Sequence, residues 1–214
     1  LRQIADRHSL FIIEDAAHCV EGERDGIRPG QLGDTACFSF YATKNLTCGE
    51  GGAIVTNHNP LAEKLRLLRM HGMTKCAADR YNEGYKHWDM VTLGWKYNMD
   101  NIQAAMLLPQ LNRLESNWQK RHLLAQQYIE KLTNINGIAW PNTIPNTRHA
   151  HHLFTIWTSE DARDAVISGL YSLGINVMVN YRPIHLLTFF AEKYGFRRGD
   201  FPIAEQIGNS TISL

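Results

Sequence analysis

Short, continuous apolar runs alternate with helix-like patterns along the first third of the chain. The run at residues 10–13 is apolar at every position, which is typical of a strand buried on both faces of a parallel sheet. Apolar runs at 36–41 and 53–56 predict two further strands. Residues 1–8 carry apolar side chains at helical spacing, and Asn59-Pro60 suits the start of another helix. The alternation predicts an α/β fold whose sheet is covered by helices.

A long amphipathic helix is predicted from Asp100 to about Asn134. Asp100 suits the N-cap position, and apolar residues recur at helical spacing beyond it. Pro109 is expected to kink or break this helix, because proline lacks the N–H that a helix interior needs. Residues 72–93, before the helix, show no clear period. They are interpreted as a surface loop, with a mobile loop over a site as the alternative.

Beyond the long helix, short strand-like runs replace the helical spacing of apolar residues. Strand-like runs at 153–157 and 175–179 enclose a helical pattern at 161–173. Strands mixed with a helix are typical of a small α+β domain. We therefore predict two domains, a larger one over 1–136 that includes the long connecting helix, and a smaller one over 137–214.

Composition and charge narrow the class of protein. Of the 214 residues, 44% are hydrophobic and 20% are charged, which is ordinary for a globular protein. The formal net charge is +1, so the sequence has no excess of basic residues of the kind that nucleic-acid binders carry. No apolar run reaches the roughly 18 residues that would span a membrane, and the first residues lack the apolar core of a signal peptide. The four cysteines show no C-x-x-C spacing. They are expected to be reduced thiols of a cytoplasmic protein, although a disulfide stays open.

An acidic residue and a lysine follow two successive predicted strands. Asp15 stands after the first strand, where open α/β sheets bind ligands, although capping of the next turn suits it equally well. Lys44 follows the second strand and precedes a glycine-rich loop at 49–52. A lysine at a strand end is usually exposed. In an apolar pocket, however, its pKa falls and the amine becomes a nucleophile towards carbonyls.

Pyridoxal phosphate chemistry requires this combination of groups. A lysine holds the aldehyde as a Schiff base, and a carboxylate keeps the pyridine nitrogen protonated, so that the ring accepts the electrons of a carbanion. Small residues and backbone N–H groups suit the phosphate. Asp15 and Lys44 are therefore candidate cofactor-binding residues.

Five short motifs follow one another in order: Glu14-Asp15-Ala16-Ala17-His18, Phe38-Ser39-Phe40, Lys44-Asn45-Leu46, Gly49-Glu50-Gly51-Gly52 and Gly94-x-x-Tyr97. In this order and spacing the chain resembles the DegT/DnrJ/EryC1/StrS family. These are pyridoxal-phosphate-dependent aminotransferases of fold type I that act on nucleotide-linked keto-sugars. The resemblance covers nearly the whole chain. It implies part of a large α/β domain with a mixed, mostly parallel sheet, and an incomplete small α+β domain.

By this resemblance, four residues bind the cofactor pyridoxal 5'-phosphate. Lys44 is the Schiff-base lysine and also the general acid/base that moves a proton between the amino-acid carbon and the cofactor carbon. Asp15 pairs with the pyridinium nitrogen. His18 packs beside the ring and its hydroxyl, and Ser39 binds the phosphate with its own hydroxyl.

The resemblance also implies a homodimer with shared active sites. Lys96 and Asn98 belong to a segment that reaches the neighbouring subunit's phosphate site in the family dimer. Many members read Gly-Tyr-Asn-Tyr-Arg there, whereas this chain reads Gly-Trp-Lys-Tyr-Asn, so either residue is a candidate contact. Tyr181 and His185 are candidate substrate contacts, and a packed or surface role stays open for His185.

The substrates implied are a nucleotide-linked keto-sugar, with a 4-keto sugar favoured, and glutamate, which leaves 2-oxoglutarate. Within the family, residues 44–48, 96–98 and 149–154 look most like the 4-amino-4-deoxy-arabinose transaminases of lipid A modification. The alternative is a non-catalytic, truncated or degenerate member that acts as a dimerising or nucleotide-sugar-binding module. A dehydratase branch of the family has histidine in place of the lysine, and Lys44 argues against it.

The ends of the chain predict a fragment of a longer polypeptide, because Leu1 lies in a helix-like segment and Leu214 in a strand-like one. The family's phosphate turn and ring-stacking aromatic residue would precede Leu1, so a fragment of this kind is expected to bind the cofactor weakly or not at all. His149, His151 and His152 suggest a metal site, but zinc needs a third and usually a fourth ligand from a partner cluster that is not evident. No metal is expected.

Overall fold

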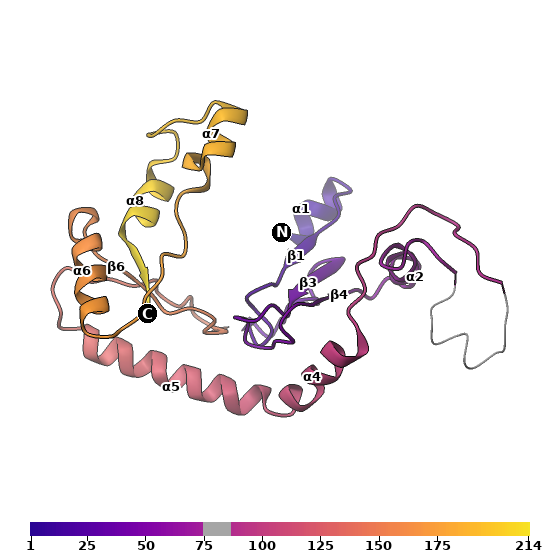
Figure 1. Ribbon diagram of the computed structural model, residues 1–214, viewed down its shortest axis with the longest axis horizontal. Coiled ribbons are helices and arrows are strands. Elements are labelled where there is room, and N and C mark those ends of the chain that lie inside the picture. Colours follow the sequence, from indigo (N-terminus) through magenta and orange to yellow (C-terminus); the bar gives the residue numbers. More distant parts are fainter. Residues whose placement is uncertain (75–86) are drawn as a thin grey trace. The chain divides into compact units, whose positions relative to one another are not determined.

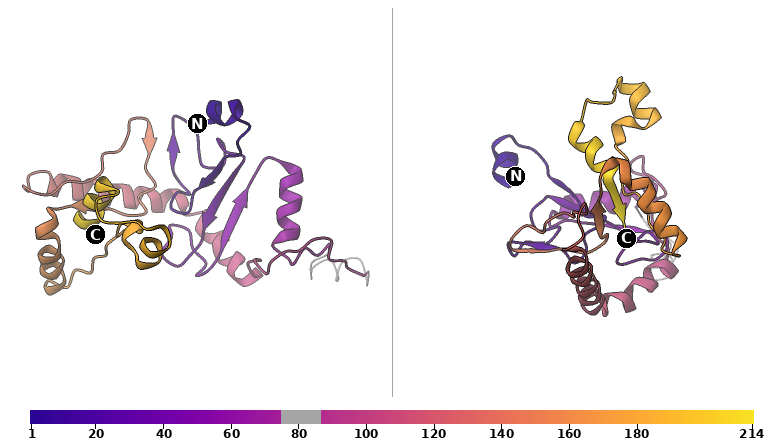
Figure 2. Two further views of the ribbon diagram at one scale, coloured as in Figure 1. Left: turned by 90° about the horizontal axis from the view of Figure 1, so that it is seen from above. Right: turned by 90° about the vertical axis from the view of Figure 1, so that its left-hand side faces the viewer.

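The computed structural model describes residues 1–74 and 87–214 (Figures 1 and 2). Most of the interpreted surface loop at 72–93, with Tyr81 and Tyr85, and the fourth cysteine, Cys76, lie outside the described residues. Cys19, Cys37 and Cys48 are free thiols. Among the described residues, no helix is long and apolar enough to cross a membrane.

The chain forms two compact units. The first comprises residues 1–118 together with 146–152, and the second comprises 119–145 together with 153–214. The predicted domain boundary after residue 136 falls within the first segment of the second unit, and the division into two domains at that residue stays a prediction.

A three-stranded mixed sheet forms the centre of the first unit. Its order is β1-β3-β4, with β1 at Ile13–Asp15, β3 at Thr35–Ser39 and β4 at Gly52–Val55. β1 runs parallel to β3, and β3 runs antiparallel to β4, so the strands lie side by side as Figure 2 shows. The mixed α/β arrangement confirms the predicted fold class. A separate ribbon pairs β2 (Glu23–Arg24) with β5 (Thr147–Arg148) antiparallel.

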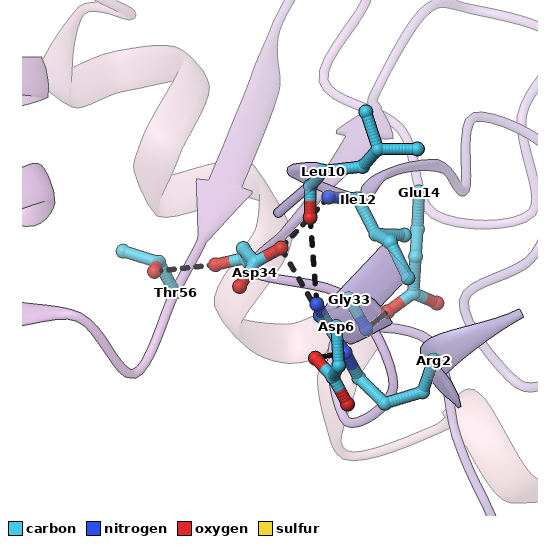
Figure 3. Close-up of polar contacts among 8 residues, drawn as sticks. All are labelled: Arg2, Asp6, Leu10, Ile12, Glu14, Gly33, Asp34 and Thr56. Atoms are coloured by element: carbon cyan, nitrogen blue, oxygen red, sulfur yellow. Dashed lines mark hydrogen bonds and ion pairs between the residues drawn. The ribbon is translucent and has the colours of Figure 1, made fainter. Parts of the chain in front are cut away.

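The first strand begins three residues later than predicted, and this corrects the expected strand at 10–13. Asp34 makes both backbone hydrogen bonds of Ile12 that a neighbouring strand would otherwise make. The Asp34 carboxylate accepts the Ile12 N–H at 2.7 Å, and the Asp34 N–H donates to the Ile12 carbonyl at 2.9 Å (Figure 3). The side chains of Leu10, Phe11 and Ile13 are exposed. The three-stranded sheet of the described chain therefore leaves this apolar run uncovered on at least one face.

Arg2 and Glu14 tie the surrounding loops to the same end of the sheet (Figure 3). Arg2 Nη1 donates to Asp34 Oδ2 at 3.1 Å. The Ile12 N–H and then the Arg2 guanidinium hold the pKa of the Asp34 carboxyl below its usual value. Glu14 Oε1 accepts the Gly33 N–H at 2.7 Å, which fixes the loop that leads into β3.

The predicted long helix is two helices. Asp100 caps the first as expected, because its Oδ1 accepts the Gln103 N–H at 2.7 Å. Pro109 lies inside this helix, which ends two residues later, in agreement with the expected break. The described helices of this half of the chain are α1 (Arg2–Arg7), α2 (Asn59–Leu68), α4 (Asn101–Leu111) and α5 (Leu114–Leu132), the last of which continues into the second unit.

The core of the first unit lies where α4 meets the end of the sheet. Phe40, Leu46, Cys48 and Leu107 are buried together, with Val20, Phe38, Ala53 and Met99 packed around them. Burying one Leu or Phe side chain stabilises a fold by about 1.5–3 kcal/mol. Because Leu46 and Cys48 lie two and four residues after Lys44, this core also holds the lysine loop in place.

The second unit contains an antiparallel ribbon with helices around it (Figure 1). β6 (Thr155–Trp157) pairs with β7 (Thr211–Ser213), and Ile156, Val177 and Ile212 form its core. The strand predicted at 175–179 is reduced to a single bridge between Met178 and Ser213. The remaining elements are α6 (Glu160–Ser172), the 3-10 helix η1 (Ile184–Leu186), α7 (Thr188–Tyr194) and α8 (Pro202–Ser210).

Candidate active site

The carboxyl ends of β1 and β3 lie on the same edge of the sheet, because the two strands are parallel. β1 ends at Asp15, with His18 three residues further on, and β3 ends at Ser39. Lys44 lies after a turn in which its N–H donates to the Tyr41 carbonyl at 2.9 Å. The sheet topology therefore brings the four residues predicted from the motifs to one edge, where open α/β sheets bind ligands.

Asp15 caps the turn that follows β1, which was one of the two roles that the sequence suggested for it. The Ala17 N–H donates to its Oδ1 at 3.1 Å, and the carboxylate is exposed at the strand end. An ionised carboxylate accepts several hydrogen bonds through two oxygens. The contact with Ala17 therefore orients the group and is compatible with a second role towards a ligand.

The pKa of His18 depends on the charges of both Lys44 and Asp15. Its ring packs at 4.2 Å, centroid to centroid, against the ring of His152. This partial burial, followed by the positive charge of Lys44, lowers the pKa of His18, and the Asp15 carboxylate opposes the shift. Although part of the residue is exposed, the imidazole is expected to be neutral near pH 7, which suits packing beside an aromatic ring.

Gln110 of α4 fixes the loop that carries Lys44. The Gln110 side chain accepts the Thr47 N–H at 3.2 Å and donates to the Thr47 carbonyl at 2.7 Å. Thr47 Oγ1 donates to the Phe40 carbonyl at 3.1 Å. Lys44 itself is half-buried. With Leu46 buried beneath it, the amine is therefore presented from a loop whose backbone is held at several points.

The glycine-rich loop owes part of its composition to packing. A Cβ atom at Gly51 would lie 2.6 Å from Cys48 Sγ and 2.7 Å from Met99 Sδ, and one at Gly52 would lie 2.8 Å from the Phe38 carbonyl oxygen. Gly49 has φ of +84°, a conformation that favours glycine. These glycines allow the chain after Lys44 to close against the core.

Ser39 is half-buried at the end of β3. Its Oγ accepts the Tyr41 N–H at 3.4 Å, a contact that is compatible with donation of the hydroxyl hydrogen to an anionic group. Lys96 and Asn98 form a pair, because Lys96 Nζ donates to Asn98 Oδ1. The described residues show no hydrogen bond between this pair and the four residues at the sheet edge.

Tyr181 and His185 belong to the second unit. Tyr181 is exposed, whereas His185 is buried, with its Nε2 2.9 Å from Glu205 Oε1 and its ring edge-on to Phe201. The hydrogen bond to His185 lowers the pKa of Glu205. These contacts give His185 a packed position, and the substrate roles of both residues stay predictions.

The motifs did not reveal the contacts of the residue after Lys44. Asn45 Nδ2 donates to Glu21 Oε2 at 3.1 Å and to the Ala150 carbonyl at 2.9 Å, and Asn45 Oδ1 lies 3.3 Å from His152 Nδ1. The only indication in the sequence that Asn45 belongs to the site was its place in the motif Lys44-Asn45-Leu46. Its partners near residue 150 are far away in the sequence.

The histidines considered for a metal site lie close to one another. The rings of His149 and His151 are 4.8 Å apart, and the His151 N–H donates to His149 Nδ1 at 2.9 Å. Burial lowers the pKa of His149. Within residues 1–74 and 87–214, no group of three or more His, Cys, Asp or Glu side chains is arranged to hold a metal ion.

Comparison with known proteins gives a consistent result. SpsC, a spore coat polysaccharide biosynthesis protein of Bacillus subtilis, is 36% identical over an alignment of 219 positions, which covers 99% of this chain and 56% of SpsC. The structure of S. venezuelae DesV, solved with a ketimine intermediate, is 38% identical with a TM-score of 0.87, covering 100% of this chain and 54% of DesV. DesI, solved in the presence of its TDP-sugar product, is 27% identical with a TM-score of 0.82, covering 100% and 52%.

The fold and the sheet-edge residues define the class as a pyridoxal-phosphate-dependent transferase of fold type I. The sequence model of the DegT/DnrJ/EryC1/StrS aminotransferase family matches residues 1–214, and the chain belongs to this family. Its aminotransferases depend on pyridoxal 5'-phosphate. The chain spans about half the length of the curated relatives it matches.

The residues of this chain fit that cofactor. An amine, a carboxylate and a hydroxyl, from Lys44, Asp15 and Ser39, lie on one edge of the sheet. Lys44 lowers the pKa of His18 and Asp15 raises it, so both charges act on this imidazole. The donor set matches an aldehyde, a pyridine nitrogen and a phosphate.

Proposed function

We propose that the protein carrying this chain is an aminotransferase that moves an amino group from glutamate to a nucleotide-linked keto-sugar. The observation that carries the proposal is that β1 and β3 are parallel, so that Asp15, with His18 three residues on, and Lys44 follow the same end of the sheet. The TDP-sugar product of DesI supports a nucleotide-linked substrate, and the name of SpsC supports a role in polysaccharide biosynthesis.

Each residue has a distinct task in this proposal. The Lys44 amine would hold the aldehyde of the cofactor and, when free, would hold and move a proton at its Nζ. Asp15, oriented by the Ala17 N–H, holds a proton at the pyridine nitrogen. Ser39 donates to the phosphate. When bound, the cofactor accepts the electron pair that remains after a C–H bond beside nitrogen breaks.

Several finer features belong to the same proposal. The keto group is at the 4-position of the sugar, and the product serves a cell-envelope polysaccharide or lipid A. The enzyme acts in the cytoplasm as a homodimer in which Lys96 or Asn98 reaches the phosphate site of the second subunit. Lys96 Nζ donates to Asn98 Oδ1, so the two side chains lie at the same place and either is in position for such a contact.

The test is glutamate-dependent amination of a panel of nucleotide 4-keto and 3-keto sugars by the full-length protein that carries this sequence. We expect amination of a 4-keto sugar, with one 2-oxoglutarate formed per amino sugar. Lys44→Arg should abolish turnover, and Lys64→Arg, which changes an exposed lysine of α2, should keep it. Absence of 2-oxoglutarate with every sugar, while Lys44 carries the cofactor, would refute glutamate as the donor.

A further inference from the structure

The side chain of Asn45 joins three separate parts of the first unit. Its amide nitrogen donates to the carboxylate of Glu21, which is buried, and to the carbonyl of Ala150. Its amide oxygen faces His152 Nδ1 at 3.3 Å. Because Asn45 follows Lys44 directly, these contacts fix the lysine loop at a point separate from the contact of Gln110 with Thr47.

The partners of Asn45 determine the orientation of its amide group. A carboxylate and a carbonyl only accept hydrogen bonds, so the amide nitrogen must face Glu21 and Ala150. The amide oxygen then faces His152 and can only accept. It follows that His152 Nδ1 carries the hydrogen, which fixes the tautomer of the neutral ring.

His152 has a second contact, because its ring packs at 4.2 Å, centroid to centroid, against the ring of His18. His18 is the residue that responds to the charges of both Lys44 and Asp15. One imidazole therefore contacts the histidine that follows Asp15 and also the residue that follows Lys44. Both halves of the candidate site are linked through His152.

The segment that carries His152 is anchored independently of these contacts. Arg148 lies 3.7 Å above the ring of Trp118 and pairs with Glu115 at 2.7 Å. Trp118 Nε1 donates to the His149 carbonyl at 2.8 Å. With β5 also paired to β2, residues 146–152 form a fixed support and not a free loop.

We propose that His152 is a positioning residue of the cofactor site. It supports the ring of His18 by packing and, through its Nδ1–H, holds the amide of Asn45 and with it the loop of Lys44. The inference rests on the proposed function, because it assigns His18 and Lys44 to the cofactor. It extends the site to a residue more than 100 positions away in the sequence.

Two substitutions separate the two contacts of His152. His152→Phe keeps a ring beside His18 and removes the Nδ1–H. His152→Asn keeps a donor near the position of Nδ1 and removes the ring. His152→Ala removes both, and His8→Ala, at an exposed histidine, is the matched control. The probe is pyridoxal 5'-phosphate itself, with its dissociation constant measured by fluorescence in the full-length protein that carries this sequence.

We expect each single-contact variant to bind the probe several-fold more weakly and His152→Ala to bind it about tenfold or more weakly, as for the loss of an ordering hydrogen bond and packing contact. His8→Ala should match the unaltered protein. Imidazole ¹⁵N–¹H correlation spectra of the unaltered protein should show His152 as the Nδ1–H tautomer. If the role of His152 were purely structural, its variants would be less stable, but the dissociation constant of the probe would not depend on which contact is kept.

Three results decide the matter. An Nε2–H tautomer of His152 would overturn the geometry, and this measurement does not depend on any variant folding. An unchanged dissociation constant in folded His152→Ala would overturn the positioning role while the proposed function stands. A failure of the proposed function is seen separately, as cofactor that never becomes attached to Lys44 in the unaltered protein, and this outcome would refute the inference too.

Discussion

Replacement of Gln110 by alanine should loosen the loop that carries Lys44 without touching the site itself. The side chain makes two hydrogen bonds to the backbone of Thr47, at 3.2 and 2.7 Å, across 63 positions of sequence. A third contact, to the Met106 carbonyl, lies within the helix turn. The substitution therefore removes a tertiary anchor and leaves the helix intact.

The expected loss of stability follows from these contacts. A typical hydrogen bond contributes about 0.5–1.5 kcal/mol, so two bonds to Thr47 give about 1–3 kcal/mol. Alanine has a higher helix propensity than glutamine, which returns a few tenths of a kcal/mol. The net destabilisation should be about 1–2.5 kcal/mol.

Urea unfolding at fixed protein concentration measures this change as a shift in midpoint at constant slope. Gln126→Ala, at an exposed position of α5, is the matched control and should stay within about 0.5 kcal/mol of the unaltered protein. Attachment of pyridoxal phosphate at Lys44 should also slow in Gln110→Ala. If Gln110→Ala and Gln126→Ala unfold at the same urea concentration, the loop is not anchored by Gln110 and the reasoning is refuted.

Other predictions follow from packing and charge. Gly51→Ala should destabilise by about 1–3 kcal/mol in thermal unfolding, because the new Cβ would lie 2.6 and 2.7 Å from two sulfur atoms. Gly169→Ala, in an open position of α6, should stabilise by about 0.5–1 kcal/mol, and an equal effect of the two substitutions would contradict the packing argument. The Ile12 N–H and Arg2 lower the pKa of Asp34 in the folded state. The ionised carboxylate therefore stabilises the fold above the unfolded pKa of about 3.9, and this stability is lost as the pH falls through the folded pKa. Asp34→Asn should therefore flatten the dependence of stability on pH below about 4, and an unchanged slope in acid unfolding would show that Asp34 is not responsible.

The sequence was sufficient where the cause of a feature is local. Asp100 caps its helix because an aspartate at an N-cap accepts an N–H three residues later, and this needs no tertiary information. The sequence placed Asp15 and Lys44 after two successive strands, and the structure adds that these strands are parallel and end together. The family motifs predicted a role for each of the four residues, and these roles stay predictions.

The sequence was insufficient where distant segments decide the outcome. The apolar run at 10–13 has the composition of a buried strand, but the backbone of Ile12 pairs with Asp34 and the strand starts at Ile13. The tie between Asn45 and His152 depends on a ribbon that returns residues 146–152 to the first unit. No local pattern around either residue indicates that contact.

The central claim is that Lys44 binds pyridoxal phosphate covalently. The most direct measurement is borohydride reduction of the full-length protein that carries this sequence after incubation with pyridoxal 5'-phosphate, followed by peptide mass spectrometry. The account predicts one modified peptide, with the reduced cofactor on Lys44, and no modification of that peptide in Lys44→Arg. A cofactor attached elsewhere, or attached equally well in Lys44→Arg, would contradict it.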